Sequence, residues 1–269
     1  MINKTTNNYL KEIKDLLKDP LIRKEKGLFI VEGAKLVNDF IFKGHEVSSM
    51  LISNNFLLKT DNIDKVDDYI ERGFEIYKCS KSDFDKASTL KNPEGILAVF
   101  TREEIFPLIK EKICDKFSAV ICDKVQDPGN LGAIIRNSVA FGYDGVVLLG
   151  ETADLYNPKV IRSSAGTILD IPVYSLQYSE VAKLKDYGIK IYASDSSGMD
   201  CEGINKIITV EPKFCVVFGS EGQGLSDEIF QEAYKRIYIP IDGVESLNVA
   251  STSAIMLYEL SSIKLGRAA

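Results

Sequence analysis

Three short stretches in the second half of the chain place glycines beside polar side chains that could bind or react with a ligand. They are DPGNLGAIIRN (residues 127–137), FGSEGQGLS (residues 218–226) and IPIDGVESLNVA (residues 239–250). Each stretch follows an apolar run typical of a strand and leads into a helical pattern, as loops at the carboxyl ends of strands do in α/β domains. Glycines in such loops let the backbone approach a ligand closely. The sequence therefore predicts one ligand site built from three loops.

The polar side chains of these stretches also have purely structural explanations. Asn130 would cap a helix expected over residues 131–141, and Ser246 or Asn248 would cap a helix expected over residues 249–265. Glu221, between glycines, would be a carboxylate on a turn. These alternatives and a role in a ligand site can hold at the same time.

Arg136 is the cation of the first stretch. It lies off the apolar face of its expected helix, as an ordinary exposed arginine does. Six residues separate it from Asn130, a net helical rotation of about 240°, so the two side chains can converge only if Asn130 precedes the first full turn. An arginine there could stabilise a developing negative charge or hold a phosphate group.

The elements that must position the three stretches alternate between strand and helix from residue 117 onward. The expected strands cover residues 117–123, 145–149, 172–174, 190–193, 214–218 and 236–241. The expected helices cover residues 131–141, 158–164, 179–187, 227–234 and 249–265. Apolar runs such as AVIC, VVLL and CVVF suit strands that are covered on both faces, which predicts a mostly parallel sheet.

A smaller α/β sandwich is expected before this domain. Its strands are predicted over residues 28–31, 48–52, 75–78 and 96–101, and its helices over residues 6–18, 34–42, 63–72 and 81–87. The charged stretch after residue 101, interrupted by Pro107, reads as a linker. The predicted organisation is a first domain at residues 1–105, a linker at residues 106–116 and a second domain at residues 117–269.

Composition narrows the classes of protein to which the chain can belong. Of its 269 residues 45% are hydrophobic, yet no apolar run approaches the roughly 18 residues of a membrane span. The N-terminus lacks the apolar core of a signal peptide, which favours a cytoplasmic protein. The five cysteines form no CxxC pair, so neither a disulfide framework nor a zinc site is expected, and Cys122 and Cys215 lie in strand-like runs as small hydrophobic residues.

Charge alone does not decide whether the partner is a polyanion. The net charge of −6 argues against one, but residues 1–44 carry nine Lys and Arg against six Asp and Glu. This first segment could supply phosphate contacts, or its lysines could form solvated helix faces.

Taken together and in this order, the three stretches resemble the motifs of the SpoU/TrmH family of RNA ribose 2′-O-methyltransferases. FIVEGAKLV and NPEGILAVF in the first domain are similar to the ribosomal-protein-like RNA-binding domain of this family. The resemblance implies S-adenosylmethionine as methyl donor without a metal, a C-terminal trefoil knot, and a homodimer with its active site near the subunit interface. It also implies an RNA substrate, with 23S ribosomal RNA favoured over tRNA.

The resemblance assigns roles to individual residues. Arg136 matches the catalytic arginine, and four further residues match positions that build the catalytic site: Asn130, Glu221, Ser246 and Asn248. Gly219, Ile239 and Leu247 match positions whose backbone binds the cofactor. Lys159 and Arg162, in NPKVIRSSAGT, could meet RNA phosphates or be surface charges. The only histidine, His45, lies in the first domain, which disfavours a histidine base.

Three other functions compete with ribose methylation. A relative that methylates a base is disfavoured by Asn130, Arg136 and the SLN sequence at residues 246–248. An RNA-binding relative without activity is disfavoured because all five polar motif residues are present. A nucleotide-binding oxidoreductase would need GxGxxG, whereas this chain has the spacing GxxGxG.

Overall fold

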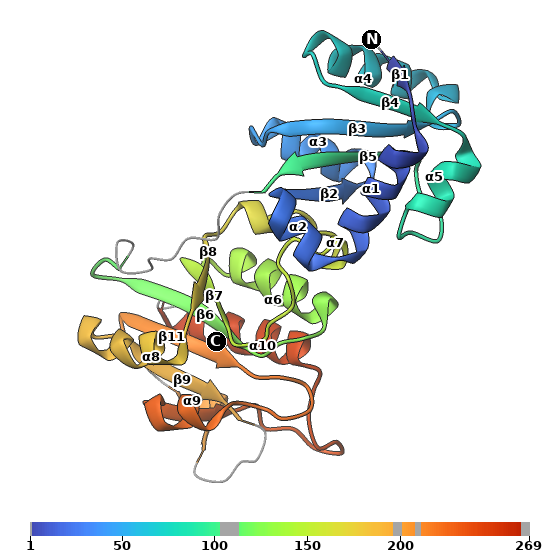
Figure 1. The fold of residues 1–269 in the computed structure, drawn as a ribbon. Coiled ribbons are helices and arrows are strands. Elements are labelled where there is room, and N and C mark those ends of the chain that lie inside the picture. The colour runs from blue at the N-terminus through green and yellow to red at the C-terminus, as the bar shows by residue number, and fades with distance from the viewer. Residues whose placement is uncertain (1, 103–112, 196–200, 208–210, 265–269) are drawn as a thin grey trace. The chain divides into compact units, whose positions relative to one another are not determined.

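The computed structural model describes residues 2–102, 113–195, 201–207 and 211–264. The chain divides into two compact units (Figure 1). Unit 1 comprises Met1–Glu104 and Tyr156–Arg162, and unit 2 comprises Ile105–Leu155 and Ser163–Ala269. Most of the expected linker falls in residues 103–112, outside the described residues. Both units are mixed α/β, as predicted.

Unit 1 is built on a five-stranded sheet with the order β1-β4-β3-β5-β2. Strand β5 pairs antiparallel with β2 and β3, while β4 pairs parallel with β1 and β3. The strands are β1 (Ile2–Lys4), β2 (Leu28–Glu32), β3 (Val47–Ser53), β4 (Ile76–Cys79) and β5 (Ile96–Thr101). Strand β1 was not predicted, because its three residues carry no apolar alternation.

Helices cover both faces of this sheet. Helices α1 (Asn7–Lys18) and α5 (Lys81–Ala87) bury apolar side chains against one face. Helix α3 (Ala34–Phe42) lies on the other, where the ring of Phe40 packs 5.2 Å from that of Phe100 in β5. Helix α4 (Thr60–Glu71) and the short 3-10 helix Phe56–Leu58 follow β3. The unpredicted helix α2 (Pro20–Lys26) begins at the N-cap Asp19 with a proline in its first turn, a recognisable start signal.

The segment Tyr156–Arg162 belongs to unit 1, although its neighbours in sequence belong to unit 2. It contains most of helix α7 (Pro158–Ser163). The ring of Tyr156 lies 4.6 Å from that of Phe29, and Nη1 of Arg162 lies 3.2 Å from Oε2 of Glu32. Because Glu32 is only 4% exposed, this ion pair anchors the segment to strand β2.

Unit 2 is built on a seven-stranded sheet with the order β10-β12-β9-β11-β6-β7-β8. All its pairings are parallel, which confirms the prediction of a mostly parallel sheet. The strands are β6 (Phe117–Asp123), β7 (Gly145–Leu149), β8 (Val173–Leu176), β9 (Lys190–Ser194), β10 (Glu202–Gly203), β11 (Lys213–Phe218) and β12 (Lys235–Tyr238). The two-residue edge strand β10 was too short to predict. Cys122 and Cys215 are fully buried in β6 and β11, as expected.

Helices again lie on both faces of the sheet. Helices α6 (Pro128–Ala140) and α10 (Val249–Lys264) pack against one another, where Asn137 Nδ2 donates to Ala250 O at 3.1 Å. The opposite face is covered by α8 (Tyr178–Val181), the 3-10 helix Ala182–Tyr187 and α9 (Asp227–Glu232). The single helix expected over residues 179–187 is thus two shorter pieces. The trefoil knot stays a prediction.

None of the described helices combines the length and the apolar character that crossing a bilayer requires.

Candidate active site

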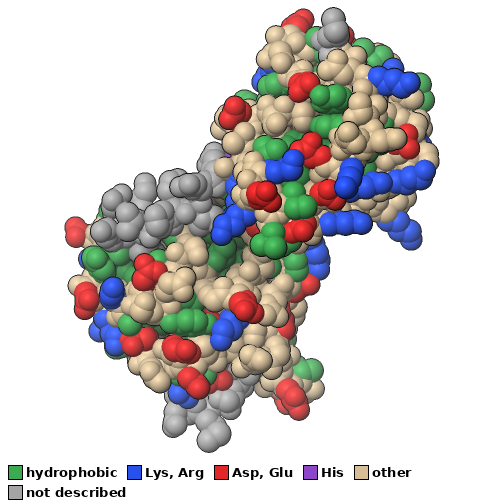
Figure 2. Space-filling model, in the orientation of Figure 1, with side chains coloured by type: hydrophobic (Ala, Val, Ile, Leu, Met, Phe, Trp, Pro, Cys, Tyr) green, Lys and Arg blue, Asp and Glu red, His purple; other side chains and the backbone are tan. Residues whose placement is uncertain are grey.

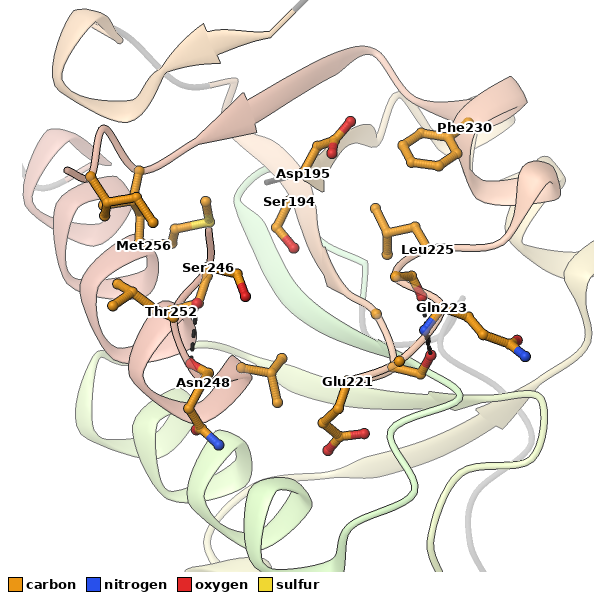
Figure 3. Close-up of a pocket in the computed structure, with 18 residues that line it drawn as sticks. Ser194, Asp195, Glu221, Gln223, Leu225, Phe230, Ser246, Asn248, Thr252 and Met256 are labelled. Carbon is orange, nitrogen blue, oxygen red and sulfur yellow. Dashed lines mark hydrogen bonds between the residues drawn. The ribbon is translucent and has the colours of Figure 1, made fainter. Parts of the chain in front are cut away.

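A pocket in unit 2 opens beside the carboxyl ends of three strands (Figure 3). Its walls are the loop that follows β11, the stretch that follows β12, the first turns of α10, and Ser194 and Asp195 at the end of β9. Strand β12 ends at Tyr238, earlier than expected. Ile239 therefore lies in the stretch after the strand, which forms one of these walls. Six predicted site residues line the pocket: Gly219, Glu221, Ile239, Ser246, Leu247 and Asn248.

The loop after β11 is held in a tight turn by its own backbone. Ser220 N donates to Gly224 O at 3.0 Å, and Gly224 N donates to Ser220 O at 3.1 Å. Gly224 has a φ of +69°, which glycine adopts without strain. A Cβ on Gly219 would lie 2.3 Å from Gly224 O and 2.6 Å from Leu225 N. Position 219 therefore has no room for a side chain, because the loop folds directly over it.

The first motif forms the start of helix α6. Asp127, not Asn130, is the N-cap: Oδ1 of Asp127 accepts from Gly129 N at 2.7 Å and from Asn130 N at 3.0 Å. Interpreting Asn130 as a cap was therefore wrong. The helix starts at Pro128, earlier than expected, because aspartate followed by proline is itself a strong start signal. This frees the side chain of Asn130 for other contacts.

The three motifs meet in a chain of hydrogen bonds centred on Asn130. Its Nδ2 donates to Oε1 of Glu221 at 2.6 Å, and its Oδ1 accepts from Nδ2 of Asn248 at 3.1 Å. The three side chains come from α6, the loop after β11 and the residue before α10. All three contacting groups are at or near the surface, and Figure 3 shows Glu221 and Asn248 at the same edge of the pocket.

Asn248 has two roles in this arrangement. Its Oδ1 accepts from Ala250 N at 2.9 Å, so it caps α10, while its Nδ2 holds Asn130. The structural and the chemical explanation of this residue thus coexist, as the sequence allowed. Ser246 is exposed on the pocket wall, and the described residues offer no hydrogen bond to its hydroxyl.

Arg136 is exposed on α6 and does not line the pocket. Within the described part of the chain it forms no hydrogen bond or ion pair with Asn130 or Glu221. Asn130 lies inside the first turn of α6, so the two side chains point in different directions around the helix, as the rotation between them requires. The structure thus unites four of the predicted catalytic residues around the pocket and leaves Arg136 apart.

Sequence reasoning missed Asn137, the neighbour of Arg136. Its Nδ2 donates to Ala250 O at 3.1 Å and to Ser253 Oγ at 2.9 Å. These bonds fasten α6 to the first turns of α10. A polar residue on the packed side of a helix pair is a recognisable signal only once the partner helix is known.

Asp123 is a second residue that the sequence did not reveal as part of the site. It is fully buried at the end of β6; its Oδ2 accepts from Ser226 N and its Oδ1 from Tyr178 Oη, both at 2.7 Å. Burial and this carboxylate raise the pKa of Tyr178. Because Ser226 directly follows Leu225, the carboxylate ties the end of the glycine-rich loop to the sheet.

The pocket combines an apolar wall with carboxylates. Leu225, Phe230, Ile239, Leu247 and Met256 provide the apolar surface, and Asp195 and Glu221 are its acidic side chains. Such a lining suits a ligand with a flat apolar ring and a positively charged centre. Among the described residues, no three His, Cys, Asp or Glu side chains gather closely enough to hold a metal ion.

Lys159 and Arg162 are not among the residues that line this pocket, and they belong to the segment assigned to unit 1. Arg162 is held by Glu32 and also donates to Thr89 Oγ1 at 3.0 Å. With 28% of its side chain exposed, it serves first as an anchor of its own segment.

Comparison with known proteins places the chain among RNA methyltransferases. The profile of the SpoU rRNA Methylase family matches residues 118–258, and that of an MRM3-like substrate binding domain matches residues 7–98. The chain is 32% identical over 241 residues to the 23S rRNA (guanosine(2553)-2′-O)-methyltransferase RlmP of Bacillus subtilis (strain 168), which covers 88% of this chain and 90% of that relative.

Two further comparisons agree. Human mitochondrial rRNA methyltransferase 3 is 26% identical over 312 residues, covering 96% of this chain and 73% of that protein. The crystal structure of an AdoMet-bound rRNA methyltransferase from Sinorhizobium meliloti superimposes with a TM-score of 0.84 at 25% identity, covering 98% of each chain. The similarity therefore extends over both units.

Proposed function

Because the chain belongs to the SpoU rRNA methylase family, we propose that it transfers a methyl group from S-adenosylmethionine to a ribose 2′-hydroxyl of ribosomal RNA, with 23S ribosomal RNA as substrate. The observation that carries the proposal is the hydrogen-bond chain Glu221–Asn130–Asn248 at the rim of the pocket. It joins the three sequence motifs that the family shares, although they come from distant parts of the chain.

The residues around the pocket fit S-adenosylmethionine. The backbone at Gly219, Ile239 and Leu247 would hold it, with Leu225, Phe230 and Met256 beside its adenine ring. Glycine at position 219 supports this role by allowing the loop to take this conformation, because a side chain there would collide with Gly224 O. When bound, this cofactor supplies an activated methyl group on a cationic sulfur, which Asp195 and Glu221 would favour electrostatically.

The protein must align the ribose hydroxyl and accommodate the loss of its proton. Alignment can contribute roughly 7–11 kcal/mol in ideal cases. We assign Arg136 to the developing negative charge on the 2′-oxygen or to the adjacent phosphate, because a guanidinium with a pKa above about 12 is a poor base. Asn130, Glu221, Ser246 and Asn248 would shape and hold the site around the ribose.

We further propose that the enzyme is a homodimer. Helix α10 exposes Ile255 (39%) and Tyr258 (55%), and the ring of Tyr258 lies 5.8 Å from that of Phe141 after α6. Large apolar side chains grouped at a surface are typical of interfaces. A dimer through α6 and α10 would also bring Arg136, which one chain leaves exposed, into an interface. Sedimentation analysis should give twice the chain mass of 29.9 kDa.

Unit 1 would bind the RNA substrate, and the enzyme would act in the cytoplasm with that RNA. Support comes from the match of residues 7–98 to a substrate binding domain.

The test uses methyl-labelled S-adenosylmethionine with unmodified 23S ribosomal RNA and tRNA transcripts. Alkali cannot cleave beside a methylated 2′-oxygen, so ribose methylation leaves label in alkali-resistant dinucleotides. Label from ribosomal RNA in dinucleotides is the expected result. Label in mononucleotides would indicate base methylation, label only from tRNA would change the substrate, and failure to bind the cofactor would refute the proposal.

A further inference from the structure

A second hollow in unit 2 lies on the other side of Phe230 from the cofactor pocket. Phe230 lines both. The second hollow, here called the β12 hollow, is formed by the edge strand β10, its neighbour β12, the end of α9, and Lys206. None of the three sequence motifs contributes to it, so the ribose methylation site leaves it unexplained.

The β12 hollow is positively charged in a chain of net charge −6. Its lining contains three cations, Lys206, Lys235 and Arg236, against one carboxylate, Glu202. Glu202 is paired with Lys235, whose Nζ lies 2.6 Å from Oε2. Lys206 and Arg236 have no carboxylate partner among the described residues, so two cations remain available to an anion.

Aromatic rings alternate with these cations. The guanidinium carbon of Arg236 lies 4.3 Å from the centre of the Phe230 ring, and Nζ of Lys190 lies 4.7 Å from the centre of the Tyr234 ring. Tyr234 is 45% exposed, so part of its ring remains open to a ligand. Arg236 and Tyr234 stand two residues apart, where β12 begins, and both line the hollow.

We propose that the β12 hollow binds a single-stranded segment of the RNA substrate beside the cofactor pocket. Lysine and arginine would contact phosphates, and Tyr234 would stack on a base, the combination by which proteins hold single strands. Phe230 lines both the hollow and the cofactor pocket, so the RNA contact would lie beside that pocket, across it from Asn248 and Glu221 (Figure 3). The inference rests on the proposed function, since it names where part of the same substrate binds.

The contact chemistry favours RNA over an acidic protein segment. The carboxylates of an acidic peptide would pair with the cations, but they offer no aromatic face to stack on the exposed Tyr234 ring. A single RNA strand presents phosphates and flat bases in alternation, as the hollow presents cations and rings. Since these contacts are to backbone and base faces, we expect little dependence on nucleotide sequence.

The test compares full-length variants with matched charge changes. Lys206→Gln with Arg236→Gln removes the two unpaired cations. Lys116→Gln with Lys183→Gln is the control, because both lysines are exposed in unit 2, outside the hollow, and lack ion-pair partners among the described residues. Tyr234→Ala removes the ring. Binding of a fluorescein-labelled single-stranded oligoribonucleotide of about 12 nucleotides is measured by anisotropy over a range of salt concentrations.

The hollow variant should bind this RNA about ten-fold more weakly, with the slope of log K against log salt shallower by about 1.4, the value for two phosphate contacts to a single strand. Tyr234→Ala should weaken binding about ten-fold with an unchanged slope. Affinity for S-adenosylmethionine should stay the same in every variant, and thermal unfolding confirms that each is folded.

Four results would overturn the inference. An equal loss in the control pair would mean that only net charge matters. An unchanged slope in the hollow variant would mean that no phosphate lies there. A parallel loss of S-adenosylmethionine affinity would make the hollow part of the cofactor pocket. Normal RNA binding by the hollow variants would refute this site. If the wild-type enzyme still methylated RNA, the proposed function would stand.

Discussion

Asn130 and Glu221 are 91 residues apart in the sequence, and Nδ2 of one donates to Oε1 of the other at 2.6 Å. The opposite atom of the same amide, Oδ1, accepts from Asn248 at 3.1 Å. Because an amide has one donor end and one acceptor end, these two bonds fix its orientation. Asn130 thus connects the start of α6 to both loops of the pocket.

Asn130→Asp should lower the rate of methyl transfer by removing the hydrogen bond from Asn130 to Glu221. The variant places a second carboxylate opposite Glu221 and removes the donor, so we expect at least a roughly ten-fold loss of kcat/KM. Stability should change little, because exposed positions usually tolerate substitution within about 0.5 kcal/mol. Methyl transfer at neutral pH and thermal unfolding are the measurements.

The control for this prediction reverses the hydrogen bond. In Asn130→Asp with Glu221→Gln, the new amide can donate to the new carboxylate, so kcat/KM should rise from its value in the single variant. A double variant with kcat/KM no higher than that of Asn130→Asp would show that the bond does not order the loop.

Gly219→Ala should abolish cofactor binding. Its Cβ would stand 2.3 Å from Gly224 O, a backbone atom that can move only if the whole loop moves. Gly222→Ala is the matched control in the same loop, because a Cβ there meets nothing within 4 Å. Calorimetric titration with S-adenosylmethionine should show no binding for the first variant and near-normal binding for the second. Equal affinities would mean that the loop is not held in this conformation.

Much of the fold and most of the pocket could be predicted from the sequence. Short apolar runs, such as AVIC in β6 and VVLL in β7, indicate buried parallel strands by themselves. The glycines and asparagines of the three motifs, each after a predicted strand, indicated that these three loops form one site. Gly219 comes from one motif and Ile239 and Leu247 from another. All three line one pocket, as expected of residues that would hold the same ligand.

What could not be predicted depends on contacts between distant residues. The buried Asp123 looks like an ordinary strand-end acid until Ser226 and Tyr178 are seen to donate to it. Asn130 is a good cap by residue type, but the hydrogen bonds of the structure give the cap of α6 to Asp127. The segment Tyr156–Arg162 joins unit 1 through Phe29 and Glu32, pairings that no local pattern encodes.

Asp123→Ala should destabilise unit 2. It leaves the half-buried donors Ser226 N and Tyr178 Oη without their acceptor, a cost of about 1–3 kcal/mol. Tyr178→Phe, which removes one donor and keeps the carboxylate, should cost about 1 kcal/mol. Urea unfolding measures both. If the alanine variant were as stable as the wild type, the carboxylate would not be holding the loop.

Alkaline pH should destabilise the protein through its buried thiols. Burial raises the pKa of Cys122 and of Cys215 to about 12, from an ordinary value of 9.0. The folded state therefore keeps protons that the unfolded state releases, so the free energy of unfolding is unaffected by these groups below pH 9 and falls as the pH rises toward 12. Urea unfolding at pH 8 and pH 10.5 measures the decrease.

Alkylation provides an independent check of the same burial. Iodoacetamide at pH 8 should modify exposed Cys114 quickly and leave Cys122 and Cys215 unmodified until the protein unfolds. Mass spectrometry of the digested protein distinguishes these sites. Modification of either strand cysteine in the native protein would contradict their burial.

Arg136→Ala should remove catalysis and leave cofactor binding intact. Arg136 does not line the cofactor pocket, so affinity for S-adenosylmethionine should stay within about two-fold, while loss of a group that stabilises developing charge lowers kcat by about a hundred-fold or more. Arg136→Lys keeps the charge without the planar fork and should be intermediate. Arg72→Ala, at an exposed arginine that directly follows α4 in unit 1 and pairs with Asp68, is the control for non-specific effects. Single-turnover transfer of labelled methyl groups measures the rate, and a near-normal rate for Arg136→Ala would show that the exposed arginine of α6 takes no part in the reaction.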